Sequence, residues 1–501
     1  MNKLRILFLA AIASFIGLET WSQIDIDYQL PPQEILELAD APMPPSIMIS
    51  RDGRNIILTH RNRFISIEEL AETEIRLAGL RINPAKNTAS RTSYSNNISL
   101  IKAGEKEAVP VQGIPSDARL AGFSWSPDQQ RMAFTNTVYN GVELWVLDIS
   151  SATARRLTGA ILNGNMGIPY TWIPNNKELL IKTLPADRQP LINKSTNIPS
   201  GPKVSVTSGT EAQNRTYADL LQDKADEFNF TQLSRSALQK VTIEGHITPW
   251  METAIYGRMN FSPDGNYVLI STWHEPYSYM VPYSRFPSKT TVYTSDARMV
   301  KVVTEQPLLE DLPKGWNSTM KGIRNINWRS DKPATLTYVI ALDEGDQANK
   351  AEFRDEVYEL PAPFDADPRS LVKTINRYSG ITWGDDNIAI VYDSWWHTRN
   401  TKTYLFNPSD AALAPQIISD RNYQDNYSDP GRFMTTRNQW GESVLDMQDN
   451  YLYLSGQGHS PDGPRAFIDR YDLNTKKTER LWQADGISTF EQVIFATDIR
   501  K

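Results

Sequence analysis

The chain repeats one pattern of polar and apolar positions. An apolar or aromatic residue is followed by small polar residues, then by a turn with Asp or Asn, and then by an alternating apolar stretch. The pattern begins at Ile49, Trp125, Trp172, Phe261, Trp328, Trp383 and, more weakly, Asp446. Its turn positions are Asp52, Asp128, Asn175, Asp264, Asp331, Asp386 and Asp449. Asp and Asn side chains bond nearby amides and a following Gly accepts positive φ, so each repeat predicts a tight turn between two strands.

The apolar stretch after each turn is typical of a strand that is covered on both faces. In the repeat at Phe261, Tyr267 and Leu269 would lie on one face, with Val268 and Ile270 on the other. Several repeats continue into a second strand–turn–strand unit, at 142–158, 291–303 and 467–482. Each repeat therefore predicts four short antiparallel strands.

Four-stranded units in series predict an all-β protein with the fold of a β-propeller. The markers predict about seven four-stranded blades. A count of eight stays open, because the seventh marker is weak and a further repeat can begin near the end. An elongated array and a set of unrelated β-sandwiches are the alternatives. Unrelated sandwiches would not share one turn signature, so the propeller is favoured.

The N-terminus has the order of a secretory signal peptide. Lys3 and Arg5 precede an apolar run at 6–18, and the small residues Thr20 and Ser22 suit cleavage before Gln23. A membrane anchor is the alternative, but 13 residues are too few to span a bilayer as a helix. We expect a signal peptide at 1–22, an N-terminal extension at 23–48 and the propeller at 49–501. The protein is predicted to be exported to a bacterial periplasm or the exterior.

An insertion of about 194–228 interrupts the third repeat. Its first part is rich in Ser, Thr, Pro and Gly. From Thr216 the pattern predicts a short amphipathic helix with Leu220 and Leu221 on one side, followed by a strand pair from 229. A functional loop on a rim and a mobile surface loop are both open interpretations.

Composition and charge limit the classes of partner that we expect this protein to bind. The chain of 501 residues has no cysteine and a formal net charge of −7. Disulfides and lipid attachment through cysteine are therefore excluded. An acidic chain without a basic tract argues against nucleic acid and anionic membranes as partners.

No catalytic constellation can be assembled from the sequence. There is no G-x-S-x-G string, and the nearest segment, from Gly458, has the character of a turn. The five histidines lie in separate repeats without metal-ligand spacing, and Asp385 and Asp386 lie in a turn. No phosphate-binding glycine loop is present. We therefore predict no catalytic residue, no metal and no cofactor in this chain, and a propeller glycosidase or lyase lacks the carboxylates it needs.

Three segments are dense in polar and aromatic residues, at 273–287, 393–406 and 419–431. Such clusters can line a pocket in which an Arg faces a carboxylate through two parallel hydrogen bonds. The alternative is that the aromatics wedge between blades and the arginines bridge strands. The predicted substrate-binding residues are Tyr279, Tyr283, Arg285, Trp396 and Arg399.

Long strings in order resemble one known family. They include LPPQEILELADAPMPPSIMISRDGR, PYSYMVPYSRFP, GIRNINWRSDKPATLTYV, WWHTRNTKTYLFNPS and SDRNYQDNYSDPG. These strings are similar to the start of glutamyl endopeptidase-like members of the prolyl oligopeptidase family of serine peptidases. The resemblance runs from about Leu30 to Lys501.

The resemblance implies a propeller that covers an α/β-hydrolase domain and restricts access to its Ser-Asp-His triad, with cleavage after glutamate. The triad has no counterpart here, so the hydrolase domain is expected to be absent and the chain inactive by itself. The implied partners are a peptide substrate and the hydrolase domain of the parent protein. The second hypothesis is a stand-alone periplasmic propeller that binds a peptide or protein.

Overall fold

The computed structural model describes residues 30–194, 216–485, 491 and 493. The predicted signal peptide lies outside these residues, as does most of the Ser/Thr/Pro/Gly-rich part of the insertion. The chain divides into two compact units, one of residues 1–44 and 62–65, the other of 45–61 and 66–501. No helix of the described residues is long and apolar enough to cross a membrane.

The described part of the small unit contains one helix, α2 (Gln33–Asp40). The Arg63 guanidinium donates hydrogen bonds to the backbone carbonyls of Leu38 and Ala41, at 3.4 and 3.0 Å. These bonds tie the end of the helix to the segment 62–65.

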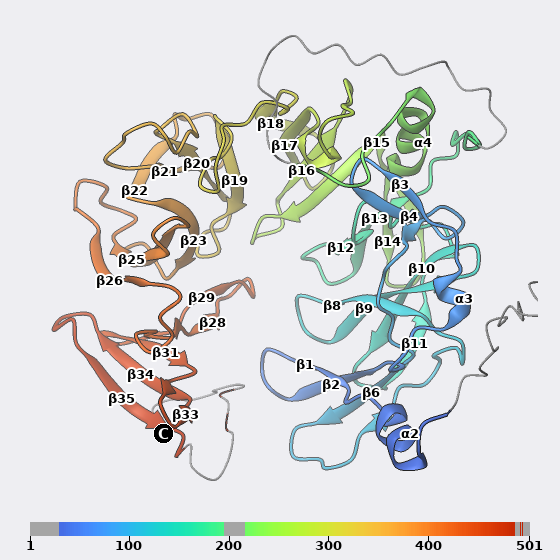
Figure 1. Cartoon of the computed structure of the whole chain (residues 1–501), viewed down its shortest axis with the longest axis horizontal. Coiled ribbons are helices and arrows are strands. Elements are labelled where there is room, and N and C mark those ends of the chain that lie inside the picture. The colour runs from blue at the N-terminus through green and yellow to red at the C-terminus, as the bar shows by residue number, and fades with distance from the viewer. Residues whose placement is uncertain (1–29, 195–215, 486–490, 492, 494–501) are drawn as a thin grey trace, which may run out of the picture. The chain divides into compact units, whose positions relative to one another are not determined.

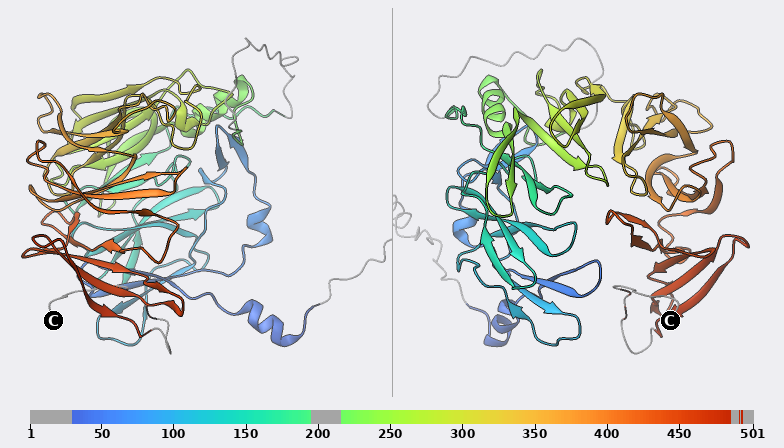
Figure 2. Two further views of the ribbon diagram at one scale, coloured as in Figure 1. Left: turned by 60° about the vertical axis from the view of Figure 1, so that its left-hand side comes forward. Right: turned by 180° about the vertical axis from the view of Figure 1, so that it is seen from behind.

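The large unit is built from antiparallel sheets, mostly of four strands, that follow one another along the chain (Figure 1, Figure 2). The first sheet has the order β1-β2-β6-β7 and the second β11-β10-β9-β8. Their strands are β1 (Ser46–Ile49), β2 (Asn55–His60), β6 (Asn97–Lys102), β7 (Val109–Pro110), β8 (Leu120–Trp125), β9 (Arg131–Val138), β10 (Gly141–Asp148) and β11 (Thr153–Arg156). The first sheet thus begins at Ser46, three residues before the predicted start of the propeller.

A seven-stranded sheet comes next, and a single long strand runs through its middle. Its strands are β12 (Tyr170–Trp172), β13 (Glu178–Thr183), β14 (Ser236–Thr242), β15 (Ile247–Phe261), β16 (Tyr267–Trp273), β17 (Ser288–Thr294) and β18 (Met299–Gln306). The first half of β15 pairs with β14, and the second half pairs with β16. The sheet therefore consists of two four-stranded units that share one strand.

Three further sheets complete the series, with the orders β19-β20-β21-β22, β23-β24-β25-β26 and β27-β31-β34-β35, β30 pairing with β31. Their strands are β19 (Ile323–Trp328), β20 (Thr335–Ala341), β21 (Asp355–Pro361), β22 (Arg369–Thr374), β23 (Arg377–Trp383), β24 (Ala389–Trp395), β25 (Asn400–Phe406), β26 (Gln416–Asn422), β27 (Arg432–Phe433), β30 (Met447–Gln448), β31 (Tyr451–Gly456), β34 (Phe467–Asp472) and β35 (Thr478–Gln483).

Smaller elements connect these sheets. They are α3 (Ile67–Leu70), the three-stranded sheet of β3 (Ile75–Leu77), β4 (Leu80–Asn83) and β5 (Thr88–Ala89), helix α4 (Lys224–Ser234), the 3-10 helix η1 (Tyr283–Arg285), and the hairpins β28 (Thr435–Arg437) with β29 (Ser443–Leu445) and β32 (His459–Ser460) with β33 (Gly463–Pro464).

The core consists of apolar layers between consecutive sheets. Leu179 and Ile181 of β13 pack toward the second sheet, whereas Leu180 packs toward β15 and β16. In β16, Val268 and Ile270 share that layer with Leu180, and Leu269 packs toward β19 and β20. The strand is buried on both faces, as the alternation of apolar residues predicted.

The repeated turn is confirmed, and it has the same hydrogen bonds in several sheets. The hydroxyls of Ser50, Ser126 and Ser262 each donate to the Asp two residues later, at 2.6 Å. Each of these Asp side chains also accepts the backbone N–H two residues further on, at 3.0 to 3.1 Å. A residue with positive φ follows the Asp in each turn, namely Gly53, Gln129 and Gly265.

Neighbouring turns are also bonded to one another. The backbone N–H of Arg51 donates to Gln129 Oε1 at 3.1 Å, and that of Asp128 donates to Asn176 Oδ1 at 2.9 Å. Further along, Lys332 forms an ion pair with Asp386. The polar residues of the repeat thus join consecutive sheets as well as closing each hairpin.

The predicted helix of the insertion lies later in the chain than the sequence pattern suggested. Helix α4 begins at Lys224, after the Asp223 carboxylate accepts the N–H of Asp226 at 3.0 Å as an N-cap. Phe230 and Leu233, three residues apart, are fully buried against β3 and β4. The predicted strand pair from 229 is therefore wrong: its first half is helical, because the cap and this apolar pair favour a helix.

Candidate functional site

The structure divides the five predicted binding residues into two groups. Tyr279, Tyr283 and Arg285 lie between β16 and β17, whereas Trp396 and Arg399 lie between β24 and β25. No contact among the described residues joins one group to the other directly. The five residues thus belong to two different connections between strands.

The tyrosines of the first group contact the elements around α4. The Tyr279 hydroxyl donates to Glu227 Oε1 of α4 at 2.6 Å. The ring of Tyr283 meets that of Trp273 edge to face, with centroids 5.4 Å apart. Both contacts are those expected of aromatic residues that hold neighbouring elements together.

Arg285 is packed against the ring of Tyr217, its guanidinium carbon 5.5 Å from the ring centroid. Arg285 Nη1 and the Tyr217 hydroxyl are both buried without a hydrogen-bond partner.

The second group belongs to an exposed aromatic stack. The ring of Trp396 stacks on that of Trp316 with centroids 5.1 Å apart and planes at 21°. The Arg399 guanidinium carbon lies 3.8 Å from the Trp396 ring centroid, and Nη1 donates to the Tyr423 hydroxyl at 3.3 Å. Trp316 is 71 % exposed and Trp396 39 % exposed, so the stack presents a large apolar surface to solvent.

A pocket of about 390 Å3 opens beside this stack, and we call it the tryptophan pocket. It is lined by residues that precede or belong to β19 and β23, by Ser394 of β24, by Trp396 directly after β24, and by Tyr423 after β26. The main lining residues are Trp316, Asn317, Arg324, Arg377, Trp396 and Tyr423. The sequence predicted Trp396 as a site residue and missed the other five.

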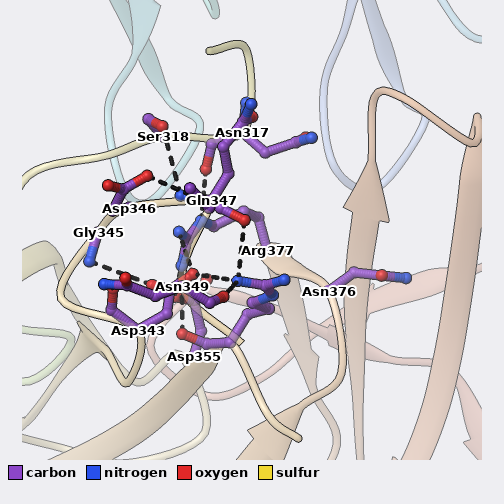
Figure 3. A network of polar contacts seen from close by, with 12 residues as sticks. Asn317, Ser318, Asp343, Gly345, Asp346, Gln347, Asn349, Asp355, Asn376 and Arg377 are labelled. Carbon is purple, nitrogen blue, oxygen red and sulfur yellow. Dashed lines mark hydrogen bonds and ion pairs between the residues drawn. The ribbon is translucent and has the colours of Figure 1, made fainter. Parts of the chain in front are cut away.

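Arg324 and Arg377 of this lining belong to a network of buried ion pairs, which we call the floor of the tryptophan pocket; Figure 3 shows the part of it around Arg377, Asp343 and Asp355. Arg377 donates to Asp343 Oδ2 at 2.7 Å and to Asp355 Oδ1 at 3.0 Å. Arg354 donates to Asp343 Oδ2 at 2.8 Å, and Arg324 is paired with Asp355. Both carboxylates are buried, Asp355 completely. Three guanidinium groups thus share two carboxylates.

Asn317 connects this floor to the aromatic stack. Its backbone carbonyl accepts from Arg377 Nε at 2.6 Å, and its side-chain Oδ1 accepts the N–H of Trp396 at 2.8 Å. The backbone N–H of Asn317 donates to Gln347 Oε1 at 3.0 Å. Asn317 Nδ2 is buried without a partner, and so is Arg324 Nε.

The ionisation of Tyr378, another lining residue, is altered by its position. Burial raises the pKa of Tyr378 to about 12, although the nearby charge of Arg324 acts in the opposite direction. A phenol in this environment stays protonated well above its usual pKa.

A second pocket, of about 590 Å3, holds a single buried lysine, and we call it the lysine pocket. Its lining includes Ser124, Trp125, Tyr170, Trp172, Lys182 and Trp273. Lys182 is 1 % exposed, and Nζ donates to the backbone carbonyl of Met166 at 3.1 Å. No carboxylate of the described residues forms an ion pair with it, and burial lowers the pKa of Lys182 to about 8.

Metal ligands are not gathered in either pocket. Within residues 30–194 and 216–485, no three His, Cys, Asp or Glu side chains come close enough to hold a metal ion.

Comparison with curated proteins finds two plant relatives. The chain is 35 % identical over 487 residues to a protein of Oryza sativa subsp. japonica named "Probable glutamyl endopeptidase, chloroplastic". It is 36 % identical over 495 residues to a protein of the same name from Arabidopsis thaliana. These alignments cover 93 % and 94 % of this chain but 52 % and 51 % of the relatives. The chain therefore spans about half the length of the curated relatives it matches.

Comparison with family models finds no match. Among solved structures, dipeptidyl peptidase 4 of Porphyromonas gingivalis aligns with a TM-score of 0.42 and 11 % identity, over 91 % of this chain and 56 % of its own. An acylaminoacyl peptidase of Pyrococcus horikoshii aligns with a TM-score of 0.39 and 10 % identity, over 90 % of this chain and 54 % of its own. TM-scores of this size carry no argument about this chain.

Proposed function

We propose that the chain forms the β-propeller part of an exported serine peptidase that cleaves after glutamate. The observation that carries this proposal is the identity of 35 to 36 %, sustained over almost the whole chain, to two proteins named probable glutamyl endopeptidase. The four-stranded antiparallel units, packed face to face by apolar layers, support their assignment as seven propeller blades.

In this proposal the chain controls access and does not perform the chemistry. The sequence has no G-x-S-x-G elbow, so the nucleophile and its triad partners would belong to an α/β-hydrolase domain of the parent protein. A propeller beside such a domain would admit short or unfolded peptides to it and exclude folded proteins.

The five residues predicted from the sequence stay proposals in this role. Trp396 lines the tryptophan pocket, and Arg399 contacts two of its lining residues, Trp396 and Tyr423. Tyr279, Tyr283 and Arg285 would then serve a separate contact with the substrate, between β16 and β17.

Labelling with a fluorophosphonate probe tests the proposal. The chain of 501 residues should take up no label, because it would have no activated serine. The product of the same gene extended by its downstream coding sequence should be labelled and should cleave peptides after Glu. A urea-unfolded sample of the extended product is the control for nonspecific reaction. Labelling of the 501-residue chain, or an extended product without label, would contradict the proposal.

Export is a separate part of the proposal. The two relatives carry the word "chloroplastic" in their names, and this compartment is stated for those proteins alone. The signal-peptide pattern predicts that the mature protein begins at Gln23. N-terminal sequencing of the protein from a periplasmic or culture fraction tests this, and an intact Met1 in that fraction would contradict it.

A further inference from the structure

We infer that the tryptophan pocket binds a carboxylate of a peptide, with Arg324 and Asn317 as its donors and the Trp316–Trp396 stack as the surface for the rest of the peptide. The assignment of that peptide as a peptidase substrate rests on the proposed function. The proposal that a carboxylate binds there does not rest on that function, because it follows from the charges and the hydrogen bonds of the pocket.

The charge balance of the floor favours an anion. Asp343 and Asp355 are divided among three guanidinium groups, those of Arg324, Arg354 and Arg377. The second oxygens of the two carboxylates are also used, since Asp343 Oδ1 accepts from Gly345 N at 3.1 Å and Asp355 Oδ2 from Tyr378 N at 2.7 Å. Among these five side chains, the guanidinium groups thus outnumber the carboxylates by one.

Two buried donors in the same lining have no partner. Arg324 is 9 % exposed and its Nε is unbonded; Asn317 is 6 % exposed and its Nδ2 is unbonded. A buried donor without an acceptor costs roughly 1–3 kcal/mol. A carboxylate has two acceptor oxygens and one negative charge, so it would satisfy both donors and the excess charge together.

The aromatic stack indicates that the carboxylate belongs to a peptide and is not a free inorganic anion. Trp316 and Trp396 present exposed, stacked rings next to the polar floor. Exposed tryptophans beside a concave polar site are typical of residues that anchor a binding partner. Phosphate would use the floor but would gain nothing from the rings.

Binding to the intact 501-residue chain can be measured by isothermal titration calorimetry with three probes. They are acetyl-Leu-Glu-amide, acetyl-Leu-Gln-amide and inorganic phosphate. The two peptides differ only at the end of the second side chain, where Gln has a neutral NH2 group in place of one carboxylate oxygen of Glu. We expect the Glu peptide to bind about 10- to 100-fold more tightly than the Gln peptide, the loss that follows when a charged hydrogen bond is removed. We also expect phosphate to bind more weakly than the Glu peptide.

The variant Asn317→Asp tests the residues. It keeps the Oδ1 acceptor for Trp396 N–H but replaces the unbonded donor with a negative charge, so Glu-peptide binding should fall at least about tenfold. Asn474→Asp, in the exposed turn between β34 and β35, adds the same charge elsewhere and should bind as the wild type does. Trp316→Ala, at a largely exposed position, should weaken both peptides and leave the affinity for phosphate unchanged.

Equal affinity for the Glu and Gln peptides, no heat of binding at millimolar peptide, or a normal affinity in Asn317→Asp would overturn the inference. Phosphate binding tighter than the Glu peptide would overturn its assignment to a peptide. These outcomes are independent of serine labelling, so a failure here can be told apart from a failure of the proposed function.

Discussion

The tryptophan pocket and the lysine pocket hold buried cations in opposite ways. In the first, Arg324 and Arg377 form ion pairs with Asp343 and Asp355. In the second, Lys182 donates to the carbonyl of Met166 and has no ion pair among the described residues, and burial lowers its pKa to about 8. An arginine does not lose its proton in a protein, so its burial requires carboxylates, whereas a lysine can become neutral.

This difference between the buried arginines and the buried lysine is why we propose a ligand for the tryptophan pocket and none for the lysine pocket. The tryptophan pocket is lined by two guanidinium groups and contains two unbonded donors. The charge of Lys182 depends on pH within the range where proteins are commonly handled. A lysine near its pKa would give a weak and pH-dependent anion site.

The largest expected effect on the free energy of unfolding is that of Asp355→Asn. The substitution leaves Arg324 and Arg377 without a full counter-charge at a completely buried position. Loss of one partner from a buried ion pair costs about 3–5 kcal/mol, and the free energy of unfolding in urea at pH 7 measures it.

Glu344→Gln is the control for that measurement. Glu344 pairs with Lys321 at 3.4 Å, and both side chains are at least 70 % exposed. This change should alter the free energy of unfolding by less than about 0.5 kcal/mol. Similar effects of the two substitutions would show that the buried pairs do not hold this part of the fold.

The next effect is the pH dependence of stability conferred by Lys182. Its pKa is about 8 in the folded chain and 10.5 in the unfolded chain, so the unfolded chain binds the extra proton between these values. The free energy of unfolding should therefore rise with pH from about 8 to 10.5, by about 3 kcal/mol from this group. Below pH 8 the whole penalty is present.

Lys182→Met isolates this contribution. The variant should be more stable than the wild type by about 3 kcal/mol at pH 7, with the advantage vanishing near pH 10.5. Urea titrations of both proteins at pH 7, 8.5 and 10 measure the difference. An advantage that stays constant over this range would mean that Lys182 does not titrate as described.

A smaller effect belongs to Tyr378 in the tryptophan pocket. Its pKa of about 12 in the folded chain lies above the value of 10 in the unfolded chain, so the unfolded chain loses its proton first. Stability from this group should fall as pH rises from 10 to 12, by about 1 kcal/mol at pH 11. Tyr378→Phe should remove this part of the decline, and a wild-type-like decline between pH 9 and 11 would contradict the assignment.

The sequence predicted the repeat well because each repeat is local. The Ser-x-Asp turn and the strand after it lie within about ten residues, and period-two alternation reports burial on both faces. Local turn residues and alternation could not predict that two four-stranded units share β15. Its two halves pair with different strands, and a continuous strand has no turn residue that would mark the change.

The candidate site was predicted only where its residues are neighbours in sequence. Trp396 and Arg399 stand out in one dense segment, and the structure brings them together. The other residues of the pocket and its ion pairs belong to separate segments and meet only when β19, β21 and β23 are assembled. They include Arg324, Asn317, Asp343 and Asp355. Their role depends on unbonded donors and on a charge excess, which are properties of the folded chain.

The most direct test is a crystal structure of the chain with acetyl-Leu-Glu-amide. The account predicts that the glutamate carboxylate lies within hydrogen-bond distance of Arg324 Nε and Asn317 Nδ2, with the rest of the peptide against Trp316. A carboxylate bound instead at Arg285, or a tryptophan pocket left empty at saturating peptide, would contradict it.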